Sequence, residues 1–120
     1  ARIQALAQHA QVHVITADTY GVAERLMAGL PVTLQVLRGP GEAAAKEALV
    51  ARLGSAATAA VGNGRNDARM LAGARVGIAV LEGEGCAATA AAAADILARS
   101  ITEALDLLLD PVRLKATLRA

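Results

Sequence analysis

The residue types that could do chemistry gather in one short segment, VGNGRND, at residues 61–67. It is a glycine-rich turn that carries two amides, Asn63 and Asn66, and one carboxylate, Asp67. Such a turn brings backbone N–H groups and oxygen ligands together at one point, which is what a metal ion or a phosphate group needs. The segment therefore predicts a metal or phosphate site.

Two residues upstream could complete such a site: Thr16, in the segment TAD, and Lys46. A hydroxyl group at a strand end can hold a phosphoryl oxygen, and an ammonium group can neutralise the charge that builds on a phosphoryl group. Oxygen ligands in the glycine turn can hold Mg²⁺, a hard cation that prefers octahedral oxygen coordination and keeps several waters. Together these residues suit Mg²⁺-dependent phosphoryl transfer.

Strands and helices alternate along the chain, and this order has to position the candidate residues. We expect strands at residues 11–16, 32–37, 57–61, 75–81 and 95–98, and helices at residues 1–7, 18–29, 42–53, 66–74, 84–93, 101–108 and 112–119. The alternation predicts an α/β fold, a doubly wound, mainly parallel, Rossmann-like sheet with helices on both faces. Because ligands sit at the carboxyl ends of parallel strands, we expect Thr16 and Asn63 at the same edge of the sheet.

Finer features of these elements are also predicted. Asp18 or Thr19 is expected to cap the second helix, and the period-2 pattern of residues 32–37 favours an edge strand. Ser100 and Glu103 have the spacing of a capping box at the start of the helix that follows them.

Composition limits the classes of protein to consider. The chain has 120 residues, of which 55% are hydrophobic, and we expect a single globular domain over residues 1–120. The net charge of +1 argues against nucleic acid or a membrane surface as a partner. No apolar run reaches the roughly 18 residues that a membrane-spanning helix needs. The single cysteine, Cys86, fits a reducing compartment, so we expect a cytoplasmic protein.

The candidate residues, taken in order, resemble a known family. Residues 15–18 (ITAD), Lys46 and residues 62–67 (GNGRND) resemble motifs II, III and IV of the haloacid dehalogenase (HAD) superfamily. The likeness is strongest to its soluble branch related to the catalytic domain of P-type ATPases, where motif II reads Thr-Gly-Asp and motif IV reads Gly-Asp-Gly-x-Asn-Asp. The resemblance continues through residues 70–71, 77–80, 94–96 and 104–108, so it covers nearly the whole chain.

The resemblance implies a phosphoryl site. Thr16, with the N–H group of Ala17 and with Gly62, would bind the transferring phosphoryl group. Lys46 would stabilise the charge of that group and of the nucleophile. The substrate would be a small phosphorylated molecule, with ATP among the candidates.

The resemblance also implies a Mg²⁺ site. Asn63 and Asp67 would serve the metal directly or through water, with Asn66 in support. Many family members have an aspartate where this chain has Asn63, and the amide brings no charge. One unit charge at about 4 Å and an effective dielectric of about 20 is worth roughly 4 kcal/mol as an upper-end estimate, so we expect weaker metal binding here.

Motif I of the family supplies an aspartate nucleophile on the central strand, and no segment of this chain matches it. We therefore expect the nucleophile upstream of Ala1 and a HAD-like sheet without its central first strand. We also expect no cap domain between residues 37 and 42, because no insertion is present there. The implied reaction is Mg²⁺-dependent hydrolysis of a phosphate ester or anhydride through an aspartyl-phosphate.

Other interpretations of the same residues stay open. The chain could be a non-catalytic, degenerate HAD-like module that binds a partner or a nucleotide. Lys46 could lie on a solvated helix face, and Asp67 could only cap a helix. Residues 39–44 and 83–88 both match the dinucleotide pattern G-x-G-x-x-A, but neither has a well-placed acidic residue for the ribose.

Overall fold

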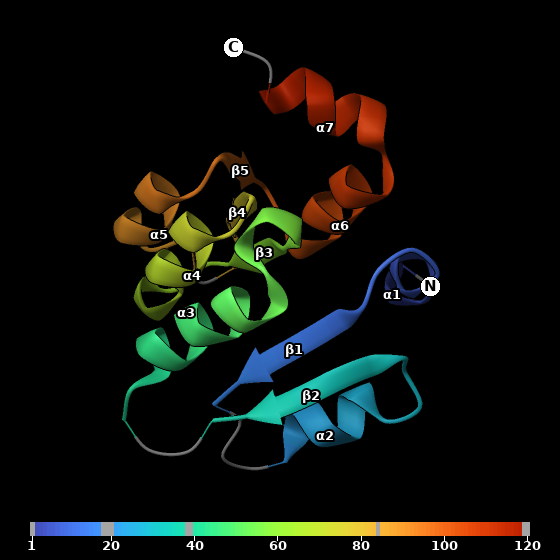
Figure 1. The fold of residues 1–120 in the computed structure, drawn as a ribbon, viewed down its shortest axis with the longest axis vertical. Helices are drawn as coiled ribbons and strands as arrows, with labels where there is room; N and C mark the ends of the chain where they lie inside the picture. Colours follow the sequence, from blue (N-terminus) through green and yellow to red (C-terminus); the bar gives the residue numbers. More distant parts are fainter. Residues whose placement is uncertain (1, 18–20, 38–39, 84, 119–120) are drawn as a thin grey trace. The chain divides into compact units, whose positions relative to one another are not determined.

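The computed structural model describes residues 2–17, 21–37, 40–83 and 85–118 (Figure 1). The chain divides into two compact units, Ala1–Glu42 and Ala43–Ala120. The predicted α/β class with parallel strands is confirmed, but the strands form two small sheets instead of one. Within the described ranges, no helix is long and apolar enough to cross a membrane.

The first unit holds two helices and a two-stranded parallel sheet. Its elements are α1 (Arg2–Ala7), β1 (Val12–Thr16), α2 (Val22–Met27) and β2 (Val32–Val36). Val12 lies opposite Val32 and Thr16 lies opposite Val36. Thr33 and Gln35 are exposed, and among the described strands β2 pairs with β1 alone, as an edge strand does. The predicted helix caps Asp18 and Thr19 lie outside the described residues.

The second unit holds a three-stranded parallel sheet in the order β3-β4-β5. Two short 3-10 turns, η1 (Ser55–Ala57) and η2 (Arg65–Asp67), flank its first strand. The remaining elements are α3 (Glu42–Leu53), β3 (Ala59–Gly62), α4 (Ala68–Gly73), β4 (Val76–Val80), α5 (Ala88–Ala93), β5 (Ile96–Ala98), α6 (Ile101–Leu109) and α7 (Pro111–Leu118). The helix predicted at residues 42–53 is confirmed at both ends.

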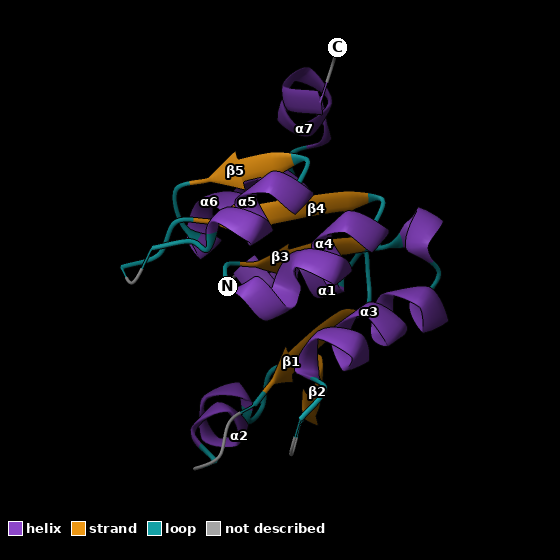
Figure 2. Cartoon of the chain, turned by 90° about the vertical axis from the view of Figure 1, so that its left-hand side faces the viewer, coloured by secondary structure: helices purple, strands orange, loops and turns teal. Residues whose placement is uncertain are grey.

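Helices cover both faces of this sheet, as the sequence predicted (Figure 2). Side chains of β4 alternate between the faces, because successive residues of a strand point to opposite sides. Ala79 belongs to the cluster of buried residues on the side of α4 and α5. Ile78 and Val80 belong to the other cluster, with Ala104 and Leu107 of α6. Buried side chains therefore pack against both faces of β4, and this packing holds its carboxyl end in place.

Several predicted boundaries are wrong, and three of them lie near the candidate site. Away from it, the helix expected at residues 18–29 begins at Val22 and ends at Met27. The strand expected at residues 57–61 begins at Ala59, because residues 55–57 form η1. The helix expected from Asn66 begins as the 3-10 turn η2 and becomes α-helical at Ala68. The helix expected from residue 84 begins at Ala88, because a turn closed by an antiparallel bridge between Glu82 and Gly85 precedes it.

The start of α6 is held by hydrogen bonds to side chains. The Ser100 hydroxyl accepts from the Glu103 N–H group at 3.1 Å, so half of the predicted capping box is confirmed. The Glu103 carboxylate accepts from the backbone N–H group of Arg99 at 2.9 Å, one residue before the expected donor. Hydrogen bonds from the side chain and then the backbone of Arg99 lower the pKa of Glu103 below its ordinary value.

Candidate functional site

Asp67 is the centre of the turn between β3 and α4. One oxygen of its carboxylate, Oδ2, accepts from the backbone N–H groups of Asn63 at 3.1 Å and Gly64 at 2.9 Å. The other oxygen, Oδ1, accepts from Lys46 Nζ at 2.7 Å. Only 7% of Asp67 is exposed. The side chain therefore folds the glycine turn around itself and joins it to α3.

Lys46 reaches the turn from the middle of α3. It is 8% exposed, and its ammonium group donates to Asn66 Oδ1 at 3.1 Å as well as to Asp67. The structure thus brings Lys46, Asn66 and Asp67 together by direct contacts. A buried ion pair has to recover the cost of leaving water through good geometry and additional hydrogen bonds. The amide of Asn66 and the two N–H groups of the turn supply such bonds here.

Gly62 ends β3 where Asp67 folds back against it. A Cβ atom built on Gly62 would lie 2.6 Å from both Cγ and Oδ2 of Asp67. Atoms do not approach that closely, so a residue with a Cβ atom at this position would displace the Asp67 side chain from its hydrogen bonds. The glycine lets the carboxylate approach the strand end, and this contact explains why the motif needs a residue without a side chain there.

Asn63 contacts the loop that follows β4. Its Nδ2 atom donates to the Gly85 carbonyl oxygen at 3.2 Å, and its own backbone carbonyl accepts from the Ala87 N–H group at 2.8 Å. Sequence reasoning missed Gly85 and Ala87. A signal for them existed, because β3 and β4 are neighbouring parallel strands and loops at their carboxyl ends must meet.

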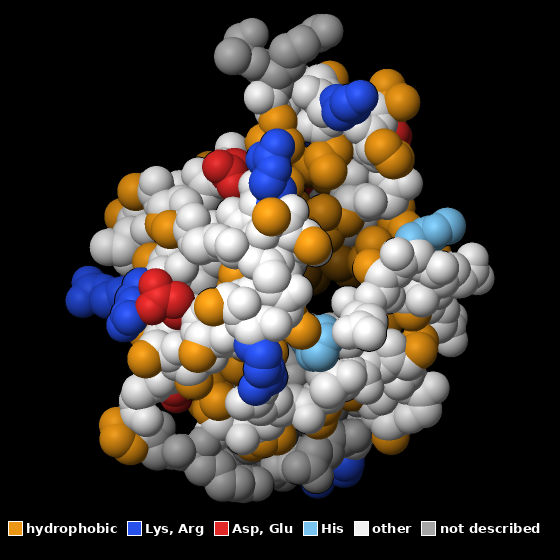
Figure 3. Space-filling model, in the orientation of Figure 1, with side chains coloured by type: hydrophobic (Ala, Val, Ile, Leu, Met, Phe, Trp, Pro, Cys, Tyr) orange, Lys and Arg blue, Asp and Glu red, His pale blue; other side chains and the backbone are white. Residues whose placement is uncertain are grey.

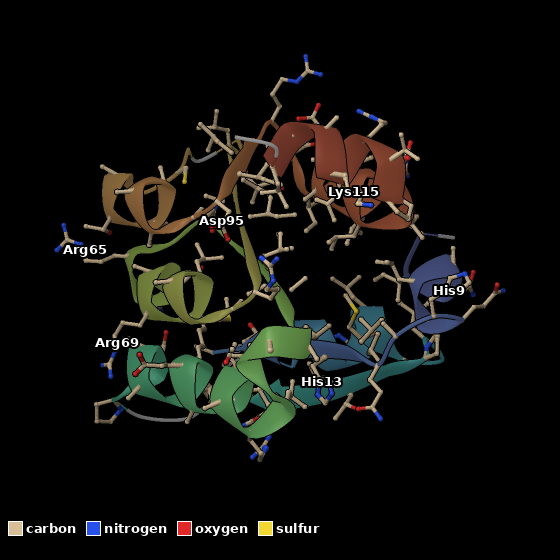
Figure 4. The ribbon with its side chains drawn as sticks, turned by 45° about the horizontal axis from the view of Figure 1, so that its top comes forward. His9, His13, Arg65, Arg69, Asp95 and Lys115 are labelled. Atoms are coloured by element: carbon tan, nitrogen blue, oxygen red, sulfur yellow. The ribbon has the colours of Figure 1, made fainter. Side chains whose placement is uncertain are left out.

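Arginines lie on the outer side of the turn. Figure 4 shows Arg65 and Arg69 extending outward from η2 and α4. Arg69 forms an ion pair with Glu47 of α3, and these side chains are 57% and 44% exposed. On the face in Figure 3, the described Lys and Arg side chains lie scattered among other side chains and form no continuous basic patch.

Thr16 and Ala17 lie at the carboxyl end of β1, in the first unit. Thr16 is the last residue of β1, and its carbonyl accepts from the Leu37 N–H group at 2.7 Å. Both residues belong to the first unit. Their expected meeting with Lys46 and Asn63 stays a prediction.

The turn offers hard oxygen donors of the kind that Mg²⁺ prefers: the amide oxygens of Asn63 and Asn66 and the carboxylate of Asp67. Among the described residues, no group of three or more His, Cys, Asp or Glu side chains could hold a metal ion. Both Asp67 oxygens already accept hydrogen bonds. The oxygen donors of the turn are thus of the kind that part of a Mg²⁺ site would use.

Comparison with known proteins found one protein of similar sequence. No family model and no solved structure matches the chain. A protein of Methanocaldococcus jannaschii, named as uncharacterized, is 47% identical over 60 residues. The match covers 50% of this chain and 64% of that protein.

Proposed function

We propose that the turn at residues 62–67 is the metal end of a phosphoryl-transfer site in a HAD-like hydrolase. Its motifs resemble those of the soluble, P-type-ATPase-like phosphohydrolases. The observation that carries the proposal is the buried contact between Lys46 and Asp67, because it joins two separate motifs of the resemblance at 2.7 Å.

Lys46 has the properties of a group that stabilises a phosphoryl oxygen. An ammonium group has three N–H donors, and two of them serve Asn66 and Asp67. The third is the donor that we assign to the phosphoryl group. Since Lys46 is buried and held by two partners, its charge acts in a medium less polar than water and needs no rearrangement during the reaction.

Asn63 is the residue that we assign as a Mg²⁺ ligand. Asp67 holds the turn and Lys46 in place and reaches the metal through water. Mg²⁺, when bound, would neutralise charge on the phosphoryl group and orient it for displacement. Thr16 and Ala17 would hold the phosphoryl oxygens from the end of β1.

The arrangement of strands fits a HAD-like core that lacks its central strand. Both sheets are parallel, and β1 and β3 belong to different sheets, each at one end of its strand order. The aspartyl-phosphate mechanism requires an aspartate nucleophile, and no segment of this chain matches the motif that supplies it. We assign the nucleophile to a segment outside this sequence.

The test is turnover of p-nitrophenyl phosphate with and without Mg²⁺. Four proteins are compared: this chain, the same chain extended upstream as its gene encodes it, and the extended chain with Lys46→Met or with Arg69→Met. We expect Mg²⁺-dependent turnover by the extended protein and by its Arg69→Met variant, which is the control, and no turnover by the other two. Equal turnover by this chain would contradict the external nucleophile.

The competing function is a non-catalytic module that binds a partner or a nucleotide. It predicts no Mg²⁺-dependent turnover by any of the four proteins. Calorimetry with ATP and NAD then separates a nucleotide-binding module from a module that binds another partner.

A further inference from the structure

The loop between β4 and α5 forms two hydrogen bonds with Asn63. The Gly85 carbonyl accepts from the Asn63 side chain, and the Ala87 N–H group donates to the Asn63 backbone carbonyl. One contact fixes the amide group and the other fixes the peptide that bears it. The loop therefore controls both where Asn63 lies and how its side chain is turned.

Gly85 presents its carbonyl from a constrained turn. Its φ angle is +90°, a left-handed conformation that residues with a Cβ atom rarely adopt. Its own N–H group donates to the Glu82 carbonyl at 2.7 Å, which closes the turn. The direction of the Gly85 carbonyl is thus set within the loop.

This carbonyl restricts the chemistry at position 63. A carbonyl oxygen only accepts hydrogen bonds, so its partner must donate. The amide nitrogen of asparagine donates, whereas the carboxylate of an ionised aspartate only accepts. An aspartate at position 63 would bring two oxygens with lone pairs together at the place of a 3.2 Å hydrogen bond.

We propose that Gly85 is a positioning residue that selects asparagine at position 63 and orients its amide. With the nitrogen held by Gly85, the amide oxygen lies on the other side of the group. The functional meaning rests on the proposed function: the oriented oxygen is the metal ligand, and the loop enforces a neutral ligand where many HAD proteins have a charged one.

The surface beside the contact has room for a small ligand. An open depression of about 440 Å³ lies there. Its lining consists of Asn63, Gly64, Gly85, Cys86 and Ala87. The thiol of Cys86, the one cysteine of the chain, is half-buried next to Gly85 and can report on the loop.

The first test uses the reaction rate of Cys86 with Ellman's reagent in metal-free buffer. We expect Asn63→Leu, a neutral change of similar size that removes the donor, to speed the reaction roughly fivefold, because loss of one net hydrogen bond favours opening of the loop by about that factor. The control is Arg69→Met. Arg69 pairs with Glu47 of α3, and both side chains are exposed, so the rate should stay at the wild-type value.

Equal rates for Asn63→Leu, Arg69→Met and the wild type would overturn the proposal. A second measurement needs no variant and so does not depend on folding. In the NMR spectrum of the metal-free wild type, the side-chain NH₂ protons of Asn63 should exchange with water several-fold more slowly than those of the exposed Gln11. Exchange as fast as that of Gln11 contradicts the contact with Gly85.

These outcomes are separate from the fate of the proposed function. Both measurements are made without Mg²⁺ and without substrate. Slow Asn63 exchange together with no Mg²⁺-dependent turnover would leave the loop contact standing and remove the hydrolase. Fast exchange together with Mg²⁺-dependent turnover would keep the hydrolase and remove the selection of asparagine by Gly85.

Discussion

Replacing Lys46 with methionine is the perturbation that probes the buried ion pair most sharply. Methionine keeps an unbranched apolar stem and removes the ammonium group. In the variant, Asp67 stays buried, and its Oδ2 atom still accepts from the N–H groups of Asn63 and Gly64. Its Oδ1 atom loses the 2.7 Å contact, and Asn66 loses its donor.

The contacts give the expected size of the effect. A hydrogen bond to a charged group is worth roughly 1.5–3 kcal/mol net, and a neutral acceptor such as Asn66 adds about 1 kcal/mol. Breaking a buried pair by removing one partner costs about 3–5 kcal/mol, because the remaining charge is uncompensated. Since two donors still serve Asp67, we expect a loss near the lower end, about 3 kcal/mol in the free energy of unfolding.

The assay is urea unfolding followed by circular dichroism, with the slope of the transition compared between variants. The matched control is Arg69→Met, which breaks the ion pair with Glu47. That pair joins the same two parts of the unit, α3 and the segment after β3, but its side chains are 57% and 44% exposed. We expect a loss of about 0–1 kcal/mol for the control, because exposed pairs contribute little.

A loss of unfolding free energy for Lys46→Met no larger than that for Arg69→Met would contradict a stabilising role of the buried pair. It would mean that the buried Lys46–Asp67 pair contributes no more to the free energy of unfolding than an exposed ion pair does. The double variant Lys46→Met/Asp67→Asn sharpens the test. It removes the stranded charge, so it should recover part of the loss and give a combined effect smaller than the sum of the single effects.

Three further predictions concern packing and pH. Gly62→Ala should cost about 1–3 kcal/mol in urea unfolding, because its Cβ atom would lie 2.6 Å from Asp67 Cγ; a neutral result would contradict the close approach. Leu71→Ala should cost about 2–5 kcal/mol, since Leu71 is fully buried, and a loss under about 1 kcal/mol would contradict its place in the core. The lowered pKa of Glu103 means that its carboxylate stabilises the fold above its ordinary pKa and that this contribution is lost as the pH falls through the lowered value. The stability difference between wild type and Glu103→Gln should therefore be constant near neutral pH and vanish in acid; a difference that does not change with pH would contradict the contact with Arg99.

Local sequence signals predicted the regular elements well. The helix at residues 42–53 has a glutamate in its first turn and a glycine after its end, and it forms with those bounds. The strand after α4 lies within the predicted range because β-branched and small apolar residues alternate across two covered faces. Each of these signals lies within a few residues of the element that it predicts, so it can be recognised from the sequence alone.

Contacts between distant segments could not be predicted in the same way. Asn63 and Gly85 are 22 residues apart, and nothing in the local pattern shows that the turn ending at Gly85 replaces the start of a helix. Lys46 and Asp67 are 21 residues apart, and helical periodicity left Lys46 with a solvated alternative. The family resemblance placed Lys46 and Asp67 in one expected site. Helical periodicity could not do so, because it describes only which side of a helix a residue lies on.

We propose that the turn at residues 62–67 binds Mg²⁺ through Asn63. The most direct measurement is a Mg²⁺ titration of the backbone N–H signals by NMR, for the wild type, Asn63→Ala and the control Arg69→Met. We predict saturable shifts confined to the turn and to the contacting loop in the wild type and in Arg69→Met, and their loss in Asn63→Ala. An absence of saturable shifts at residues 62–67, or the same shifts in Asn63→Ala, would contradict the claim.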